Sequence, residues 1–168
     1  LLGELRGEMG QVRQAEKDMI ILYEKPEAVR AAHRQWLAAL DRAKSLAGGF
    51  GTLQLVQQQA LAQDVAAHLD AYREQFGPVA RQLEAGGYDS ATIANRMSSK
   101  AVAQFATAAE QLQALDKALA AEVQGTMARQ DAIAAQTKWL FALAVLVTVV
   151  VVVPLTLLNM VSICRPLE

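Results

Sequence analysis

Residues Trp139–Cys164 read WLFALAVLVTVVVVVPLTLLNMVSIC and contain no charged side chain. A helix of this length exceeds the roughly 30 Å thickness of the hydrocarbon core of a bilayer, and it is apolar on every face. Lys138 and Arg165 flank it, and Trp139 stands where an interfacial aromatic residue is expected. A buried core helix is the alternative, but the rest of the chain is too small to cover such a cylinder. The pattern therefore predicts a transmembrane helix over 139–164.

The composition of the whole chain favours helices and excludes several classes of protein. The 168 residues include 16 Lys and Arg and 17 Asp and Glu, so the formal net charge is −1. This balance provides no positive field for nucleic acid, and we expect no nucleic-acid partner. The 10 Gly and 4 Pro are too few for the turns of a sandwich or barrel. The single Cys164 excludes an intrachain disulfide and a multi-cysteine metal site. We predict an all-α protein.

Three turn signals divide residues 1–138 into four helical segments. They are Pro26, the run GGFG at 48–51 and the run GGYD at 86–89. Because short connections make neighbouring helices antiparallel, we expect an up-down-up-down four-helix bundle. Its last helix should begin at Asp89 or Ser90, both good N-caps, and continue without a break into the membrane helix.

Apolar residues at helical spacing define the expected core of each segment. In the first segment they alternate three and four residues apart, as in a coiled coil: Leu2, Leu5, Met9, Val12, Glu16, Met19 and Tyr23. The second stripe comprises Val29, Ala32 or His33, Trp36, Leu40 and Ala43. The third comprises Leu53, Val56, Ala60, Val65, Leu69, Tyr72, Phe76, Val79 and Leu83. The fourth comprises Ile93, Met97, Phe105, Ala108, Leu112, Leu115, Leu119, Val123 and Met127.

The fourth segment is about twice as long as the first, so its partner stretch is missing near the N-terminus. We therefore expect a truncated membrane-proximal stretch and a further transmembrane helix before Leu1. A tail-anchored protein with a complete N-terminus is the alternative.

Two short stretches resemble bacterial methyl-accepting chemotaxis receptors. EKDMIILYEK at Glu16–Lys25, with Trp36 and Leu37 downstream, resembles the end of the first helix and the following turn of their four-helix-bundle sensory domains. RPLE at Arg165–Glu168 resembles the opening of the HAMP relay domain. The resemblance implies that residues 1–138 are a periplasmic sensory domain, truncated at its N-terminus, in an inner-membrane homodimer whose cytoplasmic region signals to a kinase. Histidine kinases and diguanylate cyclases reuse this module, so the output domain stays open.

Polar residues in the half of the bundle far from the membrane form the expected ligand cleft. They are Arg13, Tyr72, Arg73, Arg96 and Ser99. Arginine forks hold carboxylates bidentately, and hydroxyl groups fix orientation. Related receptors bind amino acids or dicarboxylates in this region, and the resemblance carries over to Arg13 and the stretch 92–99. A small carboxylate or an amino acid is the expected ligand.

Glu16 occupies a seam position where an apolar residue is expected. A buried carboxylate is costly unless it is paired, so the alternative to a ligand site is a structural ion pair between Glu16 and Arg73 or Arg34.

No catalytic or cofactor motif stands out, and we expect neither an enzyme nor a cofactor. The sequence has no Ser-His-Asp set and no phosphate-binding glycine loop, and His33 and His68 alone cannot make a metal or haem site. Two further functions stay open: a sensor whose input is a binding protein or physical stress, and a membrane-anchored coiled-coil scaffold.

Overall fold

The computed structural model describes residues 1–52 and 55–163, and these residues contain helices and no strand. The α-helices are α1 (Leu2–Ile21), α2 (Pro26–Gly49), α3 (Val56–Glu84), α4 (Ala91–Met97) and α5 (Ser99–Ile163), with a short 3₁₀ helix, η1 (Phe50–Thr52), after α2. The predicted all-α class is confirmed. Leu53 and residues 165–168, which the sequence assigned to the third stripe and to a HAMP opening, lie outside the described residues. The chain divides into two compact units, residues 1–120 and residues from 121 onward.

The helices begin and end at the punctuation that the sequence predicted. α2 starts at Pro26, whose fixed φ suits the first turn of a helix. α3 is followed by Gly86, which has a φ of 67°, a conformation that glycine adopts without strain. The Ser90 hydroxyl caps α4 by accepting a hydrogen bond from the Ile93 amide at 3.3 Å. The predicted turns at Pro26 and GGYD and the Ser90 cap are therefore confirmed.

A break at Ser98 separates α4 from α5, where the sequence predicted one helix. The buried Ser98 hydroxyl donates to the Asn95 carbonyl at 2.8 Å, while the Ser98 amide still bonds to the Ala94 carbonyl at 3.1 Å. A serine hydroxyl that bonds a carbonyl of the preceding turn competes with regular helical geometry. The prediction of an unbroken fourth helix from Ser90 is therefore wrong at this residue, and α5 alone continues to Ile163.

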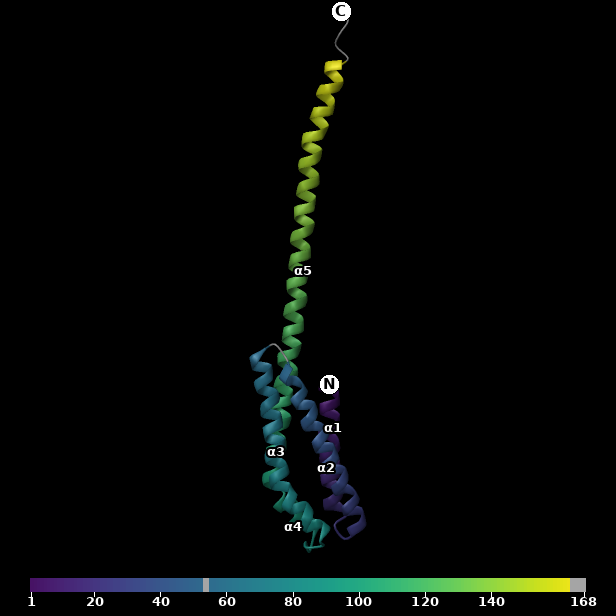
Figure 1. Ribbon diagram of the computed structural model, residues 1–168, viewed down its shortest axis with the longest axis vertical. Helices are drawn as coiled ribbons and strands as arrows, with labels where there is room; N and C mark the ends of the chain where they lie inside the picture. The colour runs from purple at the N-terminus through teal and green to yellow at the C-terminus, as the bar shows by residue number, and fades with distance from the viewer. Residues whose placement is uncertain (53–54, 164–168) are drawn as a thin grey trace, which may run out of the picture. The chain divides into compact units, whose positions relative to one another are not determined.

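The first unit is a bundle of helices that pack along one another (Figure 1). α1 packs against α2, α2 against α3, and α4 contacts both α1 and α3. α5 meets α1 through the ion pair of Arg6 with Asp116 and meets α3 through the hydrogen bond of His68 with Gln104. Hydrophobic side chains from all five α-helices enter one buried cluster.

Buried positions alternate three and four residues apart along the helices. In α3 they include Gln58, Ala62, Val65, Leu69, Tyr72, Phe76, Val79 and Leu83. From α4 into α5 they are Ala94, Ser98, Ala101, Phe105, Ala108, Leu112 and Leu115. This alternation is the spacing of a coiled-coil seam, so each helix presents one narrow stripe to the core.

The predicted stripes agree with these seams in α1 and α2 and depart from them at the start of α3 and α4. Val56, Ala60, Ile93 and Met97 were predicted to be in the core and are exposed. Those four assignments are wrong because the real seams run through the smaller or more polar residues Gln58, Ala62, Ala94, Ser98 and Ala101. Val123 and Met127 at the end of the fourth stripe are exposed as well.

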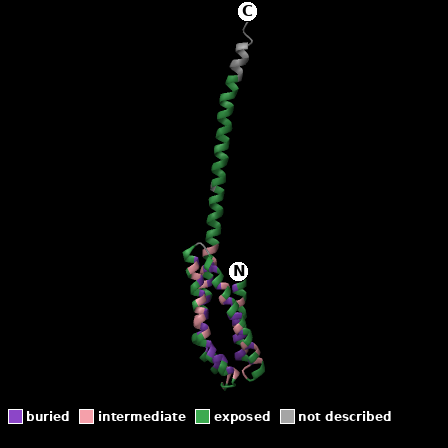
Figure 2. Ribbon diagram, in the orientation of Figure 1, coloured by how far each residue is buried: buried purple, intermediate pink, exposed green. Residues whose placement is uncertain are grey.

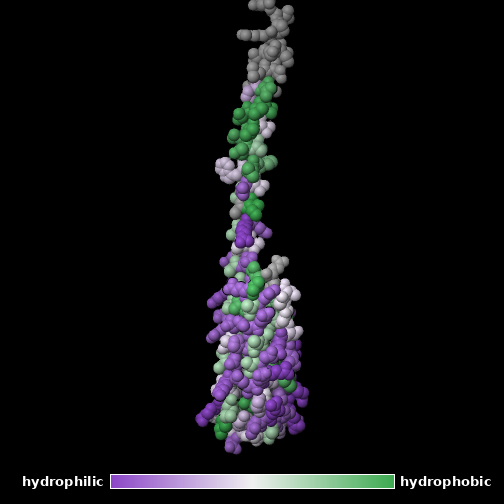
Figure 3. All heavy atoms as spheres, turned by 60° about the vertical axis from the view of Figure 1, so that its left-hand side comes forward, coloured by the Kyte–Doolittle hydropathy of each residue, from purple (hydrophilic) through white to green (hydrophobic). Residues whose placement is uncertain are grey.

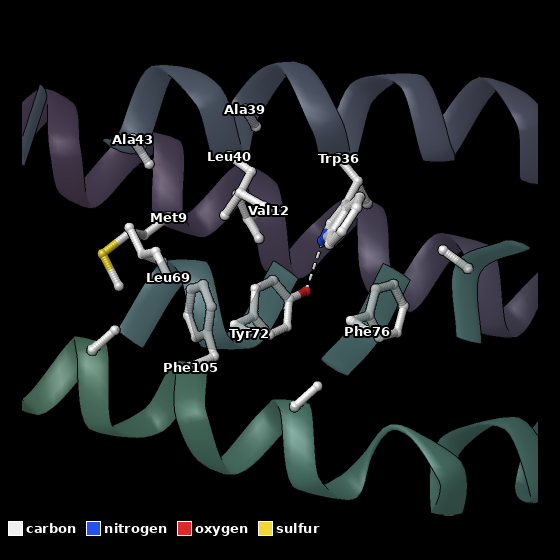
Figure 4. Packing of buried hydrophobic residues seen from close by; sticks show 14 of the residues in the cluster. Met9, Val12, Trp36, Ala39, Leu40, Ala43, Leu69, Tyr72, Phe76 and Phe105 are labelled. Carbon is white, nitrogen blue, oxygen red and sulfur yellow. Dashed lines mark hydrogen bonds between the residues drawn. The ribbon is translucent and has the colours of Figure 1, made fainter. Parts of the chain in front are cut away.

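Four aromatic rings fill the middle of the bundle (Figure 4). Trp36 of α2 lies 5.8 Å from Tyr72 and 5.3 Å from Phe76 between ring centroids, and Phe105 of α5 lies 5.2 Å from Tyr72. Tilted and edge-on pairs at these distances contribute about 0.5–1.5 kcal/mol each beyond the area that they bury. The rings therefore fix the spacing of α2, α3 and α5 at this level.

The second unit is the part of α5 from Ala121 onward, and its described side chains are exposed. Every residue between 121 and 155 whose burial the structure describes is exposed, as the green ribbon of Figure 2 shows. Towards the C-terminus the exposed side chains become apolar (green in Figure 3) and include Phe141, Leu146 and Val150. The Thr148 hydroxyl donates to the Ala144 carbonyl at 2.8 Å, so it is satisfied within the helix. In the described part of the chain, one helix is long and apolar enough to cross a membrane.

Candidate ligand site

Glu16 is a carboxylate in the core of the first unit. It occupies the seam of α1 between Val12 and Met19, and 1% of its surface is exposed. Its Oε2 forms an ion pair with the Arg13 guanidinium one turn earlier and accepts a hydrogen bond from the Tyr72 hydroxyl at 2.7 Å. A buried charge with both a counterion and a hydrogen-bond donor avoids most of the desolvation cost of an isolated carboxylate.

Tyr72 links this carboxylate to α2. Its hydroxyl donates to Glu16 and accepts from the Trp36 Nε1–H at 2.8 Å, the contact marked in Figure 4. Burial, followed by the negative charge of Glu16, raises the pKa of the Tyr72 phenol far above its usual range. The hydroxyl therefore stays protonated and remains a donor. The chain Trp36–Tyr72–Glu16–Arg13 joins α2, α3 and α1 in one polar network.

Arg13 is the end of this network that reaches solvent. Its side chain is 27% exposed, and its guanidinium carbon lies 5.5 Å from the centre of the Phe105 ring. The predicted structural pairing of Glu16 with Arg73 or Arg34 is wrong, because Arg13 forms the ion pair and Arg73 instead pairs with Asp41 at 2.7 Å. The partner of Glu16 is thus supplied by its own helix, three residues away.

The five predicted ligand residues are distributed over three places. Arg13 and Tyr72 meet through Glu16. Arg73 lies on the α2–α3 side with Asp41, and Arg96 and Ser99 are exposed on α4 and at the start of α5. Tyr72 is fully buried, so its hydroxyl serves the network and not a solvent-filled cleft. As ligand contacts, the five residues stay a prediction.

A groove of about 560 Å³ runs between α1 and α5 and includes Arg13 in its wall. The lining residues are Arg6, Met9, Gly10, Arg13, Phe105, Ala109, Glu110, Leu112, Gln113 and Asp116. Apart from Arg13, none of these residues was predicted from the sequence to belong to a site. The small residues Gly10 and Ala109 line the groove from two helices, but nothing in the sequence indicates that they lie together.

The lining of the groove combines an ion pair with apolar side chains. Arg6 and Asp116 join α1 to α5 with an ion pair of 2.9 Å. Met9, Phe105 and Leu112 are at most 8% exposed and form the floor. The volume and the mainly apolar lining with a few charged groups are typical of small-molecule sites.

Other ion pairs hold the neighbouring helices at the surface of the bundle. Glu8 Oε2 of α1 lies 2.9 Å from Arg42 Nη2 of α2, and this ion pair raises the pKa of the Arg42 guanidinium. Lys44 pairs with Asp70 between α2 and α3. Where the first part of α2 meets the end of α3, His33 Nδ1 lies 2.9 Å from Glu84 Oε2. These contacts hold the helices together outside the groove.

No protein-family model matches the chain, and neither a curated protein nor a solved structure matches it.

Proposed function

We propose that residues 1–138 are the extracytoplasmic ligand-sensing domain of a transmembrane chemotaxis receptor. In this proposal residues 139–164 cross the inner membrane, the domain is periplasmic and the receptor works as a homodimer. A cytoplasmic kinase complex reads the signal, and the chain itself catalyses no reaction. The single observation that supports this function most is the continuity of α5, which carries both core residues of the bundle and the apolar segment. The stretches EKDMIILYEK and RPLE add the resemblance to this family.

The proposed sensory domain is an antiparallel four-helix bundle. Its helices are α1, α2, α3 and the combined α4–α5 segment. Contacts between α1 and α5 support opposite directions, because Arg6 meets Asp116 while Arg13 meets Phe105. Contacts between α2 and α3 support the same, since His33 meets Glu84 and Lys44 meets Asp70.

Signalling in this proposal depends on two alternative packings of α5 against the bundle. A ligand that binds one packing more tightly shifts the population towards it, and couplings of this kind are typically about 1–3 kcal/mol. Because the same helix continues through Trp139, a shift or rotation in residues 99–120 needs no separate connecting element to pass into the apolar segment.

The test is a hybrid receptor. The chain is joined after Glu168 to the HAMP and signalling region of a chemotaxis receptor, in a bacterium that lacks its own receptors, and kinase activity is followed while a metabolite panel is added. We expect at least one compound to change kinase activity. A hybrid that inserts and folds but never controls the kinase with any compound would contradict a sensory role and favour the membrane-anchored scaffold.

Three insertions test the route through α5. Two glycines after Lys138 should abolish the response, because glycine weakens the helix and the insertion rotates everything that follows. Seven helix-forming residues at the same point should retain part of the response, since a heptad restores the helical phase to within about 20°. Two glycines between Gly86 and Gly87, which lie in a turn, are the matched control and should leave the response intact. An unchanged response with glycines after Lys138 would overturn transmission through the helix.

A further inference from the structure

We infer that a cleft between two turns of the bundle binds a soluble organic cation of the quaternary ammonium class. One turn connects α1 to α2 (residues 22–25) and the other connects α3 to α4 (residues 85–90), and both lie at the same end of the first unit (Figure 1). This turn cleft is separate from the groove between α1 and α5 and from the five residues predicted from the sequence. The inference rests on the proposed sensory function, to which it adds a class of ligand and a site.

The turn cleft has a volume of about 440 Å³, within the range of small-molecule sites. Side chains from both turns and from the helix ends beside them form its wall. They include Tyr23, Glu24 and Pro26 on one side and Glu84, Ala85 and Tyr88 on the other. The wall therefore combines two aromatic rings, two carboxylates and small apolar groups.

Tyr23 and Tyr88 supply the aromatic part of the wall. Both side chains are partly buried and pack against the hydrophobic core, so their rings are held in place before a ligand arrives. Burial raises the pKa of Tyr88, and the hydrogen bond to Glu24 raises the pKa of Tyr23, so both phenols stay neutral. The face of a neutral aromatic ring attracts a cation, and such rings recognise quaternary ammonium ions. Rings that are already ordered lower the entropy cost of binding.

The charges of the wall favour a cation. Of the described residues that line the turn cleft, the charged ones are Glu24 and Glu84, and both are acidic. The Tyr23 hydroxyl orients Glu24 by donating to its carboxylate at 2.9 Å. His33 is outside the wall, and its Nδ1 lies 2.9 Å from Glu84 Oε2, so it offsets at most one of the two negative charges. The wall is therefore negative by one or two charges, depending on the protonation of His33.

The basic residues close to this wall in the sequence do not line it. Arg30 already has an ion pair of 2.9 Å with a carboxylate of its own helix. Arg81 is directed along α3 towards Gly77, where its Nη1 would lie 3.6 Å from an added Cβ. Lys25 and Arg34 are exposed, so solvent and salt screen their charges. Apart from the contact with His33, the carboxylates of the wall are therefore left for a cation from solution.

The contacts of the wall favour a methylated cation over a primary ammonium. A primary ammonium donates three hydrogen bonds and needs three acceptors. Both carboxylates already have a partner, namely the Tyr23 hydroxyl and the His33 ring. The methyl groups of a quaternary ammonium need no acceptor, and they match the tyrosine rings and the proline and alanine side chains of the wall.

The experiment measures binding to the full chain by calorimetry and by thermal shift. A maltoside detergent is used, because phosphocholine lipids would carry the same cationic group as the ligand. The probes are choline and tetramethylammonium, with dimethylbutanol, in which a carbon replaces the choline nitrogen, as the neutral isostere. Ethanolamine is the primary amine, and calcium chloride is the metal salt. We expect the two quaternary ammonium ions to bind with a Kd of about 1 mM or below, and dimethylbutanol and ethanolamine to bind at least about tenfold more weakly.

Two pairs of variants locate the binding. Tyr88→Leu removes a ring and should lower the affinity for choline about two- to thirtyfold, whereas Tyr88→Phe keeps the ring and should recover most of that loss. Glu24→Gln removes a charge and should lower the affinity about two- to fivefold, an effect that shrinks as salt is added. Glu74→Gln is the matched control, because Glu74 is an exposed carboxylate of α3 outside the wall. Unfolding of each variant without ligand checks that the bundle is intact.

Several outcomes overturn the inference. They are the absence of binding by both quaternary ammonium ions, equal binding of dimethylbutanol or ethanolamine, and a choline affinity that neither Tyr88→Leu nor Glu24→Gln lowers. Calcium that binds more tightly than choline and is lost with Glu24→Gln would assign the cleft to a metal ion, which also overturns the inference. None of these measurements uses the hybrid receptor, so failure of this site and failure of the sensory function are distinguishable.

Discussion

The two units of this chain place their apolar side chains in opposite ways. In residues 1–120 each helix buries a narrow seam, and its polar residues face water or pair across helices. From 121 to 155 the side chains described by the structure are exposed, although many are Val and Leu. α5 belongs to both regions. Along this one helix, the side chains change from being buried by other helices to being exposed.

Both the number of apolar residues and their arrangement around the helix therefore indicate where a helix is covered by other helices. A helix with one apolar stripe is completed by neighbouring helices, whereas a helix that is apolar all round needs a lipid environment or a large protein core. The first unit supplies partners for the stripe of α5 as far as Leu115, with Leu119 partly buried. Substitutions at matched residues of the two units therefore test this difference.

The two tryptophans provide the largest expected contrast. Trp36 is 1% exposed in the aromatic cluster, and Trp139 is 74% exposed in the second unit. Trp36→Ala should lower the free energy of unfolding of the bundle by about 3–5 kcal/mol, because it leaves a cavity and removes the donor to Tyr72. Trp139→Ala should leave bundle stability nearly unchanged. Denaturant unfolding in the same detergent measures both.

A smaller effect of Trp36→Ala than of Trp139→Ala would contradict the division of the chain into a packed unit and an uncovered one. Near-ultraviolet circular dichroism provides the check on folding, since loss of Trp36 should remove most of the signal from the aromatic cluster.

Arginine placed in the apolar stretch should prevent membrane insertion. Val149→Arg puts a charge in the middle of the segment. At the centre of a transmembrane helix, an arginine raises the free energy of insertion by about 2.5–3.5 kcal/mol. Val123→Arg is the control, because Val123 is also exposed but lies among polar residues of α5. We expect carbonate extraction to release the Val149→Arg protein from membranes and to leave the Val123→Arg protein bound. Retention of both proteins would count against a membrane-spanning role for this stretch.

The hydroxyl of Tyr72 should stabilise the fold in a way that depends on pH. Tyr72→Phe removes the donor to Glu16 and the acceptor for Trp36, at a cost of about 1–3 kcal/mol near neutral pH. Burial raises the pKa of Tyr72 in the folded state, so its contribution is complete below the ordinary tyrosine pKa of about 10 and declines as the pH rises above it. The stability difference between wild type and Tyr72→Phe should therefore stay constant up to about pH 9 and narrow between about pH 10 and pH 11.

The check is thermal unfolding of both proteins across that range. A difference that stays constant would mean that Tyr72 ionises as easily in the folded protein as in the unfolded one, against its buried position.

The sequence predicted the seams where the large apolar residues themselves follow the alternating spacing. This was so in α1, including Glu16, and in most of α3. In α3 the spacing of Val65, Leu69, Tyr72 and Phe76 fits only one face of the helix. It failed in α4, where Ile93 and Met97 are more apolar than the buried Ala94 and Ser98. The rings of α2 and α3 are bulky, and the buried positions Ala94 and Ser98 are small, which hydropathy alone does not reveal.

The site was predictable in part for a related reason. A carboxylate at a seam position identified Glu16 as a group that needs a partner, and this requirement is general. Which arginine pairs with Glu16 depends on the direction of each side chain. The partner is Arg13, one turn earlier on α1, and not an arginine of another helix. The groove could not be predicted, because it arises where Gly10 and Ala109 from distant parts of the sequence line the same space.

The pair Arg73–Asp41 supplies the smallest effect and tests whether Arg73 belongs to a site at all. The two side chains are 40% and 61% exposed, and their ion pair spans 2.7 Å between α3 and α2. Exposed ion pairs of this kind contribute about 0.2–1 kcal/mol, so a double-mutant cycle of Arg73→Ala and Asp41→Ala should give a coupling within that range. Neither variant should alter the response of the hybrid receptor to a compound, since neither residue lines the groove or the turn cleft. If Arg73→Ala abolished that response while the bundle kept its stability, the ligand would have to be sought on the α2–α3 side, where Arg73 pairs with Asp41.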